Sequence, residues 1–365
     1  MSSPSSLPLV SVVVPAFNVQ ETLSETVRSA TAGTYRNIEI ILVDDGASTD
    51  ATSAVAEELA DEDHRVRIVR REKGWLSEAV NSGFAAARGD YVARLDGDDL
   101  WHPSKLQAQV DFAIRHPDAA FIYTFARYID SENRVMRDGP RQSFPRWALC
   151  RGICESIVGG GSSALIKRSA IQEAGGWDES LSNWEDLLLQ LAVSRRHPIG
   201  CVPSYLVGYR VRPHSLSKNI DDMLEGWRAV MAKLAAGYPE VPRFVRAWAH
   251  AARCAMFAEG FAWRGRYLRS LALLAEAMRN DAKGVAELLR FRLARRSAKA
   301  LWPTDPSGSA PDFFDCDPEL PVMVDWFQQH PSSRRFTQFE QERWRVLAEL
   351  DEQLASNSSL RVEAS

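Results

Sequence analysis

The chain has 365 residues, 25% of them charged, and a formal net charge of −4. This length allows one large domain with a smaller one attached. Because the net charge is small and both signs are well represented, the composition excludes a polyelectrolyte partner such as nucleic acid. Five scattered cysteines without a CxxC pair are typical of reduced thiols, so we expect a cytoplasmic protein.

The first eight residues are predicted to be a disordered leader, since residues 1–8 are rich in Ser and Pro and lack the positive region of a secretory signal. From residue 10 to residue 95, short β-branched runs alternate with amphipathic segments, which is typical of βα units that build a mainly parallel sheet. The predicted strands are 10–14, 38–43, 66–69 and 91–95, with amphipathic helices between them.

After residue 95 the pattern becomes less regular. The sequence predicts a helix at 103–115, a strand at 119–129, irregular structure at 139–161, a strand at 163–167, a helix at 185–197 and a strand at 204–212. Together with the βα repeats, these elements form an α/β domain that we expect to span residues 9–218. The remaining predictions are a helical C-terminal domain at 219–302, an irregular linker at 303–335, a terminal helix at 336–356 and a disordered tail at 357–365.

Polar loops follow each of the first four predicted strands. They are Pro15-Ala16-Phe17-Asn18, Asp44-Asp45-Gly46, Lys73-Gly74-Trp75-Leu76-Ser77 and Asp96-Gly97-Asp98-Asp99. In an open α/β sheet such loops share one edge, where ligands bind. Turn chemistry alone explains one or two loops of this kind but explains four poorly. No GxGxxG and no GxxxxGK[ST] occurs, so neither a dinucleotide fold nor a P-loop is supported.

Three carboxylates, those of Asp96, Asp98 and Asp99, gather at the end of the fourth predicted strand. Two carboxylates about 4 Å apart repel by about 1 kcal/mol in water and about 4 kcal/mol at an effective dielectric near 20. A divalent metal that carries a phosphate-bearing substrate would supply the missing positive charge. The alternative is that Arg94, on the same strand face as Asp96, neutralises part of the cluster while water solvates the rest.

Six segments in a fixed order give the first 215 or so residues a resemblance to a known family. They are VSVVVPAFN, ILVDDGASTDAT, GWLSEAVNSGFAAARGDYVARLDGDD, SSALIKRSAIQEAGGWDE, WEDLLLQLA and YRVRPHSLS. The chain resembles a family-2 glycosyltransferase with a GT-A fold. That resemblance implies a nucleotide-sugar donor, a divalent cation, Mn²⁺ or Mg²⁺, and transfer with inversion at the anomeric carbon.

The resemblance also assigns the nucleotide-binding residues. The loop with Pro15, Phe17 and Asn18 would line the base and ribose, and Asp45 would accept a hydrogen bond from the imide N–H of the base. This role suits a pyrimidine donor, with UDP favoured over dTDP. Asp44 could equally hold its own turn.

Asp96 and Asp98 match the DxD positions of the family. One of them would contact ribose or bound water and the other the metal, with Asp99 as the alternative metal ligand. Carboxylate and diphosphate oxygens suit Mg²⁺ or Mn²⁺.

Asp186 matches the catalytic base of the family, the carboxylate that takes the proton from the attacking acceptor hydroxyl. Its neighbours Trp184 and Glu185 would face the acceptor or the sugar. Because Asp186 lies at a predicted helix start, the alternative for both acids is helix capping, worth ~1 kcal/mol.

Two arginines and a histidine close the matched region. Arg210, Arg212 and His214 would receive the leaving nucleoside diphosphate, since an arginine fork matches phosphate oxygens. The family has Gly more often where this chain has His214, and a solvated surface strand is the alternative. A triplet of glycines at 159–161 could approach the ligand closely or could be a flexible connector.

We therefore expect an inverting glycosyltransferase that moves a sugar from a nucleotide-diphosphate sugar to a hydroxyl of a saccharide, lipid-linked or small-molecule acceptor in polysaccharide, glycolipid or glycoconjugate biosynthesis. The alternative is a catalytically silent nucleotide-binding or protein-interaction scaffold. The basic segment 288–299 could rest on the inner face of a membrane or be a solvated bundle face. The helical region also offers a surface for homodimer formation.

Overall fold

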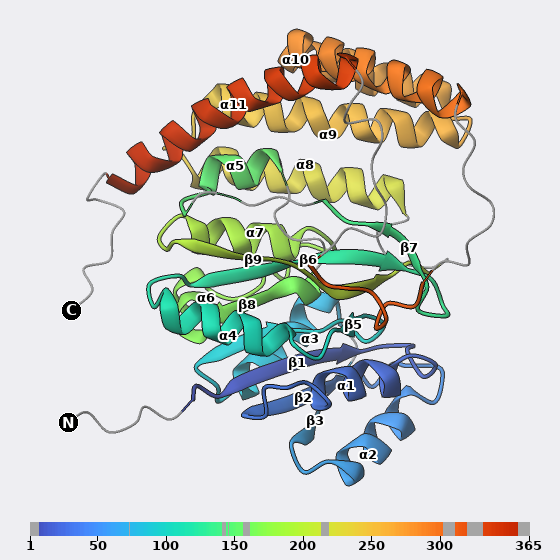
Figure 1. Cartoon of the computed structure of the whole chain (residues 1–365), viewed down its shortest axis with the longest axis vertical. Coiled ribbons are helices and arrows are strands. Elements are labelled where there is room, and N and C mark those ends of the chain that lie inside the picture. The colour runs from blue at the N-terminus through green and yellow to red at the C-terminus, as the bar shows by residue number, and fades with distance from the viewer. Residues whose placement is uncertain are drawn as a thin grey trace. The chain divides into compact units, whose positions relative to one another are not determined.

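The computed structural model describes residues 7–72, 74–140, 144, 146–155, 161–212, 219–301, 311–319 and 331–356, without the side chains of 291–301 and 331–337. The chain divides into two compact units. The first comprises residues 1–146, 157–213 and 310–322, and the second comprises residues 147–156, 214–309 and 323–365. The first unit contains the sheet, and the second is helical (Figure 1).

The first unit is built on one sheet. Its strands are β1 (Val10–Ala16), β2 (Ile38–Asp44), β3 (Val66–Arg70), β4 (Tyr91–Arg94), β5 (Leu100–Trp101), β6 (Phe121–Ile129), β7 (Val135–Asp138), β8 (Ala164–Lys167) and β9 (Ile199–Arg210). Their order is β3-β2-β1-β4-β8-β6-β9-β5, and β7 pairs with β6. The half from β3 to β4 is parallel, and β6 is parallel to β9, whereas β8 is antiparallel to both β4 and β6. The predicted mainly parallel α/β sheet is confirmed.

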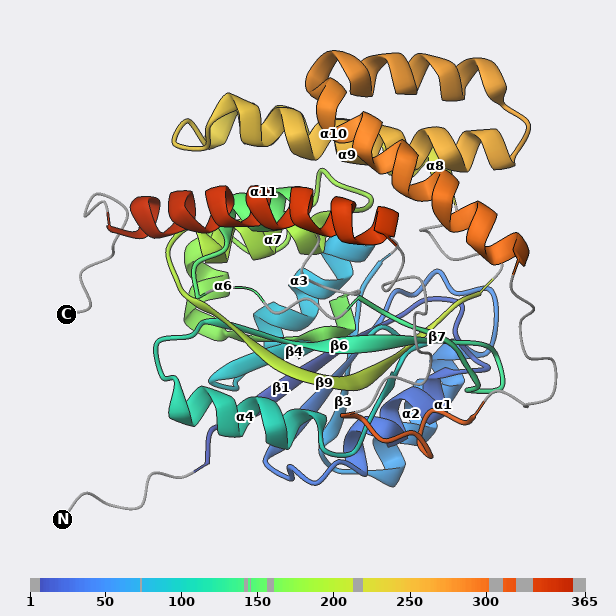
Figure 2. The same ribbon diagram turned by 45° about the horizontal axis from the view of Figure 1, so that its top comes forward.

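Helices cover both faces of this sheet (Figure 2). They are α1 (Leu23–Thr31), α2 (Thr52–Glu62), α3 (Leu76–Ala86), α4 (Lys105–Arg115), α6 (Arg168–Ala174) and α7 (Glu185–Ser194), with a short 3₁₀ turn, η1 (Gly161–Ser163). Alternate strand residues such as Val12 and Ile40 share one apolar cluster with α1, α2 and α4. On the opposite face, α3 packs so closely that a Cβ on Gly83 would lie 2.4 Å from Val13.

The parallel half brings the predicted ligand loops to one edge. Ala16 at the end of β1 is in register with Asp44 at the end of β2, and Asp44 is in register with Arg70 of β3. Arg94 ends β4 beside Val13 of β1. Because parallel strands point the same way, the loops that follow them all leave from this edge.

Three elements lie where the sequence predicted no regular structure. The strand β5 follows the acidic loop directly and pairs with β9, and β7 pairs with β6. A further helix, α5 (Leu149–Cys154), lies inside the stretch predicted to be irregular. In addition, residues 311–319 belong to the first unit, where Phe313 is buried in a cluster with Leu100 and Ile129.

The second unit is built from α5, α8 (Ile220–Gly237), α9 (Arg243–Trp263), α10 (Tyr267–Leu301) and α11 (Pro331–Ser356). Helix α9 packs along α10 and also contacts α5 and α8, while α11 contacts α5 and α10. Helix α10 is interrupted at Asp281, whose φ of −157° and ψ of 77° are not helical. Among the described residues, no helix combines the length and the apolar character that a membrane span requires.

Candidate active site

The acidic loop between β4 and β5 holds its three carboxylates in different ways. Asp96 accepts a two-pronged interaction from Arg94, with Nε–Oδ1 2.5 Å and Nη2–Oδ2 3.0 Å. Asp98 Oδ2 lies 2.7 Å from Nε of Arg212. Asp99 is buried and accepts hydrogen bonds from the Ser162 hydroxyl and the backbone N–H of Arg210. Asp96 and Asp98 are therefore the two whose partners are charged side chains.

Burial is the main cause of the raised pKa values of Asp98 and Asp99 in this loop. It raises the pKa of Asp98, and the Arg212 guanidinium only partly opposes this effect. The pKa of Asp99 is raised well above its usual range by burial and then by the charges of Asp98 and Asp96. Carboxylates held close together away from water favour any cation that can reach them. Oxygen donors of this kind fit a hard divalent cation such as Mn²⁺ or Mg²⁺.

Ser162 connects the acidic loop to the 3₁₀ turn behind it. Its Oγ accepts the backbone N–H of Asp96 (3.0 Å) and donates to Asp99 Oδ2 (2.6 Å). Its carbonyl oxygen accepts the indole N–H of Trp101 at 2.9 Å. Ser162 is fully buried, so both ends of the loop depend on a hydroxyl that water cannot replace.

Arg94 links the acidic loop to helix α7. The Arg94 guanidinium, which also binds Asp96, donates from Nη1 to Glu185 Oε1 at 2.7 Å, and both side chains are almost fully buried. Gly161 permits this path, because a Cβ at that position would lie 2.8 Å from Cζ of Arg94. The predicted acceptor residue Glu185 therefore has an arginine as its partner.

Asp186 lies beside this network, in the first turn of α7. Burial raises the pKa of Asp186 to about 6, and the neighbouring charge of Glu185 adds to the rise, while Arg94 opposes it. With Arg94 and Trp177, Asp186 lines a small hollow of about 20 Å³. The structure therefore brings a carboxylate of raised pKa close to the same arginine that holds the acidic loop.

The backbone at Trp184 is in an unusual conformation. Trp184 immediately precedes α7 and has a φ of +65°, in the left-handed region that bulky residues rarely occupy. Such conformations cost about 1–3 kcal/mol and tend to be found at functional sites. Trp177, by contrast, is buried and meets Phe84 edge to face at 6.0 Å, so its ring belongs to the core.

The loop after β1 is tied to the loop after β2. Asn18, with a left-handed φ of +49°, accepts the backbone N–H of Thr49 on Oδ1 at 2.8 Å. Its own N–H donates to the hydroxyl of Ser48 at 3.1 Å. Phe17 remains 47% exposed beside it, and Pro15 is half-buried. An exposed aromatic ring at a sheet edge is available to a planar ligand.

Asp45 joins the loops after β2 and β3. Its Oδ1 accepts the N–H of Gly74 at 3.1 Å and lies 3.4 Å from Nη1 of Arg71. Burial raises the pKa of Asp45, although the Gly74 N–H and Arg71 lower it in part. Asp44 accepts the N–H of Gly46 and therefore holds its own turn.

The two predicted arginines of β9 and the residues after it differ in their surroundings. Arg210 is 2% exposed, and its guanidinium donates to the carbonyl oxygens of Asp98 and Asp130 and to the carboxylate of Glu25. The side chain of Arg212 is 34% exposed and pairs with Asp98. Predicted residue His214 lies outside the described residues, as do Lys73, Gly159 and Gly160.

Comparison with known sequences identifies the domain that carries the loops after β1, β2, β3 and β4. Glu185, Asp186 and the two arginines lie beyond the matched residues. Residues 11–175 match the family described as Glycosyl transferase family 2. A relative described as an uncharacterised glycosyltransferase, from Rickettsia conorii, is 30% identical over 219 residues, which is 59% of this chain and 36% of the relative. Residues 11–175 therefore form a family-2 glycosyltransferase domain. It spans 23% of a second relative, an uncharacterised protein of Sinorhizobium fredii that is 32% identical over 216 residues, 57% of this chain.

Solved structures show the same fold. TarS 1–349 of S. aureus, solved in complex with UDP-GlcNAc, aligns with a TM-score of 0.58 at 18% identity, over 79% of this chain and 87% of TarS 1–349. The mannosyltransferase PcManGT of Pyrobaculum calidifontis, solved with GDP-Man and Mn²⁺, aligns with a TM-score of 0.55 at 17% identity, over 97% of this chain and 89% of PcManGT. The predicted GT-A fold is confirmed, and the predicted family-2 domain is confirmed for residues 11–175.

Sequence reasoning missed several residues that shape the candidate site. Ser162, Glu25 and Arg71 each bind a predicted site residue or its loop. Their partners are distant in the sequence, so no local pattern could show the contacts. Of these three residues, only Ser162 could have been noticed in the sequence, because it lies within one of the segments shared with the family.

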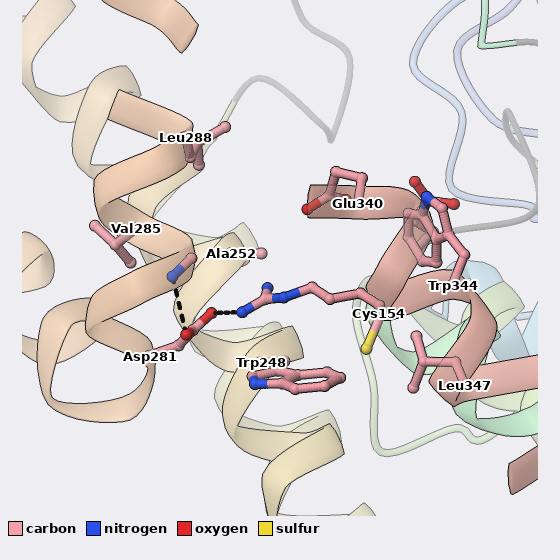
Figure 3. A pocket seen from close by; sticks show the side chains of 12 residues that line it. Cys154, Trp248, Ala252, Asp281, Val285, Leu288, Glu340, Trp344 and Leu347 are labelled. Atoms are coloured by element: carbon pink, nitrogen blue, oxygen red, sulfur yellow. Dashed lines mark hydrogen bonds and ion pairs between the residues drawn. The ribbon is translucent and has the colours of Figure 1, made fainter. Parts of the chain in front are cut away.

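A second hollow lies in the helical unit (Figure 3). This cavity of about 160 Å³ is lined from α5, α9, α10 and α11, with Trp248 and Trp344 in its wall. Arg343 pairs with Asp281 across it, and burial raises the pKa of Glu155 to about 7. None of the predicted site residues lines it.

Proposed function

We propose that the chain is an inverting glycosyltransferase that uses a nucleotide-diphosphate sugar, with UDP favoured over dTDP, and an acceptor hydroxyl. The observation that carries this proposal is the buried connection from Asp96 through Arg94 to Glu185 and its neighbour Asp186. A site of this kind would hold a diphosphate and a proton acceptor close together.

The nucleotide would lie over the loops that follow β1 and β2. Phe17 is exposed enough to face the base, and Asn18 and Pro15 would complete the wall for base and ribose. Asp45 would accept the imide N–H of a uracil or thymine ring. Because Gly74 and Arg71 already hold Asp45 Oδ1, its carboxylate is fixed in place before a ligand arrives.

A divalent cation, Mn²⁺ or Mg²⁺, would be held by Asp98 together with Asp96. When bound, it would balance the charge of the diphosphate leaving group. Asp99 is 1% exposed and both of its oxygens accept protein hydrogen bonds, whereas the side chain of Asp96 is 21% exposed. We therefore propose that Asp99 supports the loop rather than binding the metal directly. The support for metal use is the oxygen-only donor set and the presence of Mn²⁺ and GDP-Man with PcManGT.

The leaving diphosphate would be received by Arg212. Without ligand, the guanidinium of Arg212 pairs with the carboxylate of Asp98, and Arg212 is the more exposed of the two arginines. When a metal ion binds Asp98 instead, Arg212 can turn to the phosphate oxygens. Arg210 would act by fixing the loop, because its three donor nitrogens already have protein acceptors. His214 is also proposed to contact the diphosphate, as the family resemblance implies.

Asp186 would take the proton from the acceptor hydroxyl. A pKa near 6 leaves this carboxylate mostly ionised at pH 7 and still basic enough to accept a proton. Glu185 would position Arg94, and Trp184 would face the acceptor or the transferred sugar. The acceptor class, a saccharide, lipid-linked or small molecule in polysaccharide, glycolipid or glycoconjugate synthesis, follows from the family resemblance. A cytoplasmic location is proposed from the five free cysteines.

The test is hydrolysis of a panel of UDP-, dTDP- and GDP-sugars without acceptor, with Mn²⁺, Mg²⁺ or excess EDTA. We expect release of one nucleoside diphosphate, abolished by EDTA and by Asp98→Asn. The exposed Asp61 on α2 provides a matched control, since Asp61→Asn makes the same chemical change away from the site. Metal-independent release, or equal loss in Asp61→Asn, would contradict the proposal. Nucleotide binding without any turnover would favour the alternative, a silent scaffold.

A further inference from the structure

Three side chains of metal-binding type converge on one point in the helical unit. His250 and Cys254 lie one turn apart on α9, and Glu276 lies on the adjoining α10. One potential ligand atom from each lies within 4.8 Å of the other two. His250 Nε2 is 2.7 Å from Glu276 Oε1 and 3.4 Å from Cys254 Sγ. No role in the transferase chemistry uses these residues.

The spacing is close to that of a tetrahedral metal site. Typical distances from zinc, about 2.0–2.2 Å to nitrogen or oxygen and about 2.3 Å to sulfur, place such ligand atoms roughly 3.3–3.6 Å apart. The observed separations of 2.7 and 3.4 Å reach these values with side-chain movements well below 1 Å. The spacing of four residues on one helix fixes the His–Cys pair, and the α9–α10 packing adds the carboxylate.

The surroundings hold the carboxylate of Glu276 toward His250. Nδ1 of His250 is buried without a hydrogen-bond partner among the described residues, whereas Nε2 faces the other two side chains. Arg228 on α8 pairs with Glu276 Oε2 at 3.2 Å and leaves Oε1 turned to His250. A charged partner on the far oxygen holds a ligating carboxylate in place.

The site is reachable from solvent on one side. Cys254 is fully buried, while the side chains of His250 and Glu276 are 15% and 25% exposed. An ion could therefore enter past the histidine and the glutamate and keep a water molecule as its fourth ligand. One nitrogen, one sulfur and one oxygen donor favour Zn²⁺ over Mg²⁺ or Mn²⁺, which prefer oxygen alone.

We propose that His250, Cys254 and Glu276 form a Zn²⁺ site that joins α9 to α10. Binding would release the thiol proton of Cys254 to solvent, and the thiolate and the carboxylate would together balance the charge of the ion. The competing explanation is a hydrogen-bonded chain from His250 through Glu276 to Arg228 that needs no metal. The proposal is independent of the transferase proposal, because its three residues lie on α9 and α10 and none of them belongs to the acidic loop or to the other proposed transferase residues.

Cobalt spectroscopy separates these two explanations. The full-length protein is freed of metal with a chelator and titrated with Co²⁺, because a Co²⁺–thiolate bond gives an intense near-ultraviolet charge-transfer band. We expect a band that saturates at one equivalent and is displaced by Zn²⁺. The same band is expected in Asp98→Asn, which changes only the acidic loop, and in Cys154→Ser, a control for another thiol of the helical unit. It is expected to be absent from Cys254→Ser.

Two further variants keep the test decisive if Cys254→Ser does not fold. His250→Gln and Glu276→Gln remove one donor each at partly exposed positions, and we expect each to weaken Co²⁺ and Zn²⁺ binding by at least about tenfold. Zn²⁺ should raise the melting temperature of the parent protein but not that of Glu276→Gln. The absence of the band in the parent protein would overturn the proposal, as would a band that persists in folded Cys254→Ser or affinities unchanged in both Gln variants.

Discussion

Replacement of Asp186 by Asn should separate catalysis from stability. Asp186→Asn keeps the size of the side chain and removes the base, so we expect donor turnover to fall by about 10²–10⁴, the usual contribution of a positioned general base. Donor binding should remain nearly intact, because Asp186 is proposed to meet the acceptor hydroxyl. Initial rates of nucleoside diphosphate release and calorimetric titration with the nucleotide measure the two effects separately.

The pH dependence of the parent enzyme provides the second half of this prediction. With a pKa of about 6, Asp186 is about nine-tenths ionised at pH 7 and about one-tenth ionised at pH 5. Because the ionised form is the base, kcat/KM should fall roughly tenfold between these two pH values, with a slope approaching one. The residual activity of Asp186→Asn should lack this limb. A flat parent profile down to pH 5 would refute the assignment of the base.

As the pH rises from 5 to 7, the contribution of Asp186 to folding stability should fall while the activity of the enzyme rises. The pKa of Asp186 rises from an ordinary 3.8 to about 6 in the folded protein, so folding favours the protonated form. Its contribution to stability is therefore greatest below about pH 4 and is lost as the pH rises through about 6. At pH 7 the ionised carboxylate of Asp186 costs up to about 3 kcal/mol of folding stability, a cost that Asn does not incur.

Two variants test this argument by their melting temperatures at pH 7. Asp186→Asn should melt at or above the melting temperature of the parent protein, whereas Glu185→Gln, which weakens a buried ion pair, should melt below it. A large loss of stability in Asp186→Asn would mean that the side chain is mainly structural.

Three other substitutions test the rest of the site. Arg212→Gln should raise the donor KM about tenfold or more, because a charge-assisted hydrogen bond to phosphate is worth about 1.5–3 kcal/mol, and an unchanged KM in steady-state kinetics would exclude the diphosphate role. Ser162→Ala should lower the free energy of unfolding by about 1–3 kcal/mol in urea titrations, since Asp99 loses a buried donor, and an unaltered midpoint would show that the bond matters little. Gly161→Ala should reduce kcat at least about tenfold, because its Cβ would lie 2.8 Å from Cζ of Arg94, and parental kinetics would show that Arg94 can move without loss.

The parallel sheet and its ligand edge could be predicted because they depend on local patterns. Asp45, Asp96 and Asp98 follow buried strands whose apolar runs are visible in the sequence, and parallel strands bring their ends to one edge. The same reasoning cannot predict a strand as short as β5. Its two residues show no pattern of their own, and only the pairing with β9 makes them a strand.

The partners of individual charges could not be predicted. Arg210 has the residue type of a phosphate ligand, yet the structure gives it Glu25, 185 residues away, as an acceptor. Gly161 could be a flexible connector by its sequence, whereas the structure shows that it makes room for Arg94. Both roles depend on contacts between distant segments, and residue type alone does not specify such contacts.

The most direct test of the account is calorimetric titration of the full-length protein with UDP in the presence of Mn²⁺ and in the presence of EDTA. The account predicts saturable binding at one site with Mn²⁺, strongly weakened by EDTA and by Asp98→Asn and unaffected by Asp61→Asn. Absence of nucleotide binding, or binding with the same affinity in Mn²⁺ and EDTA, would contradict the claim that the acidic loop holds a cation against the donor diphosphate.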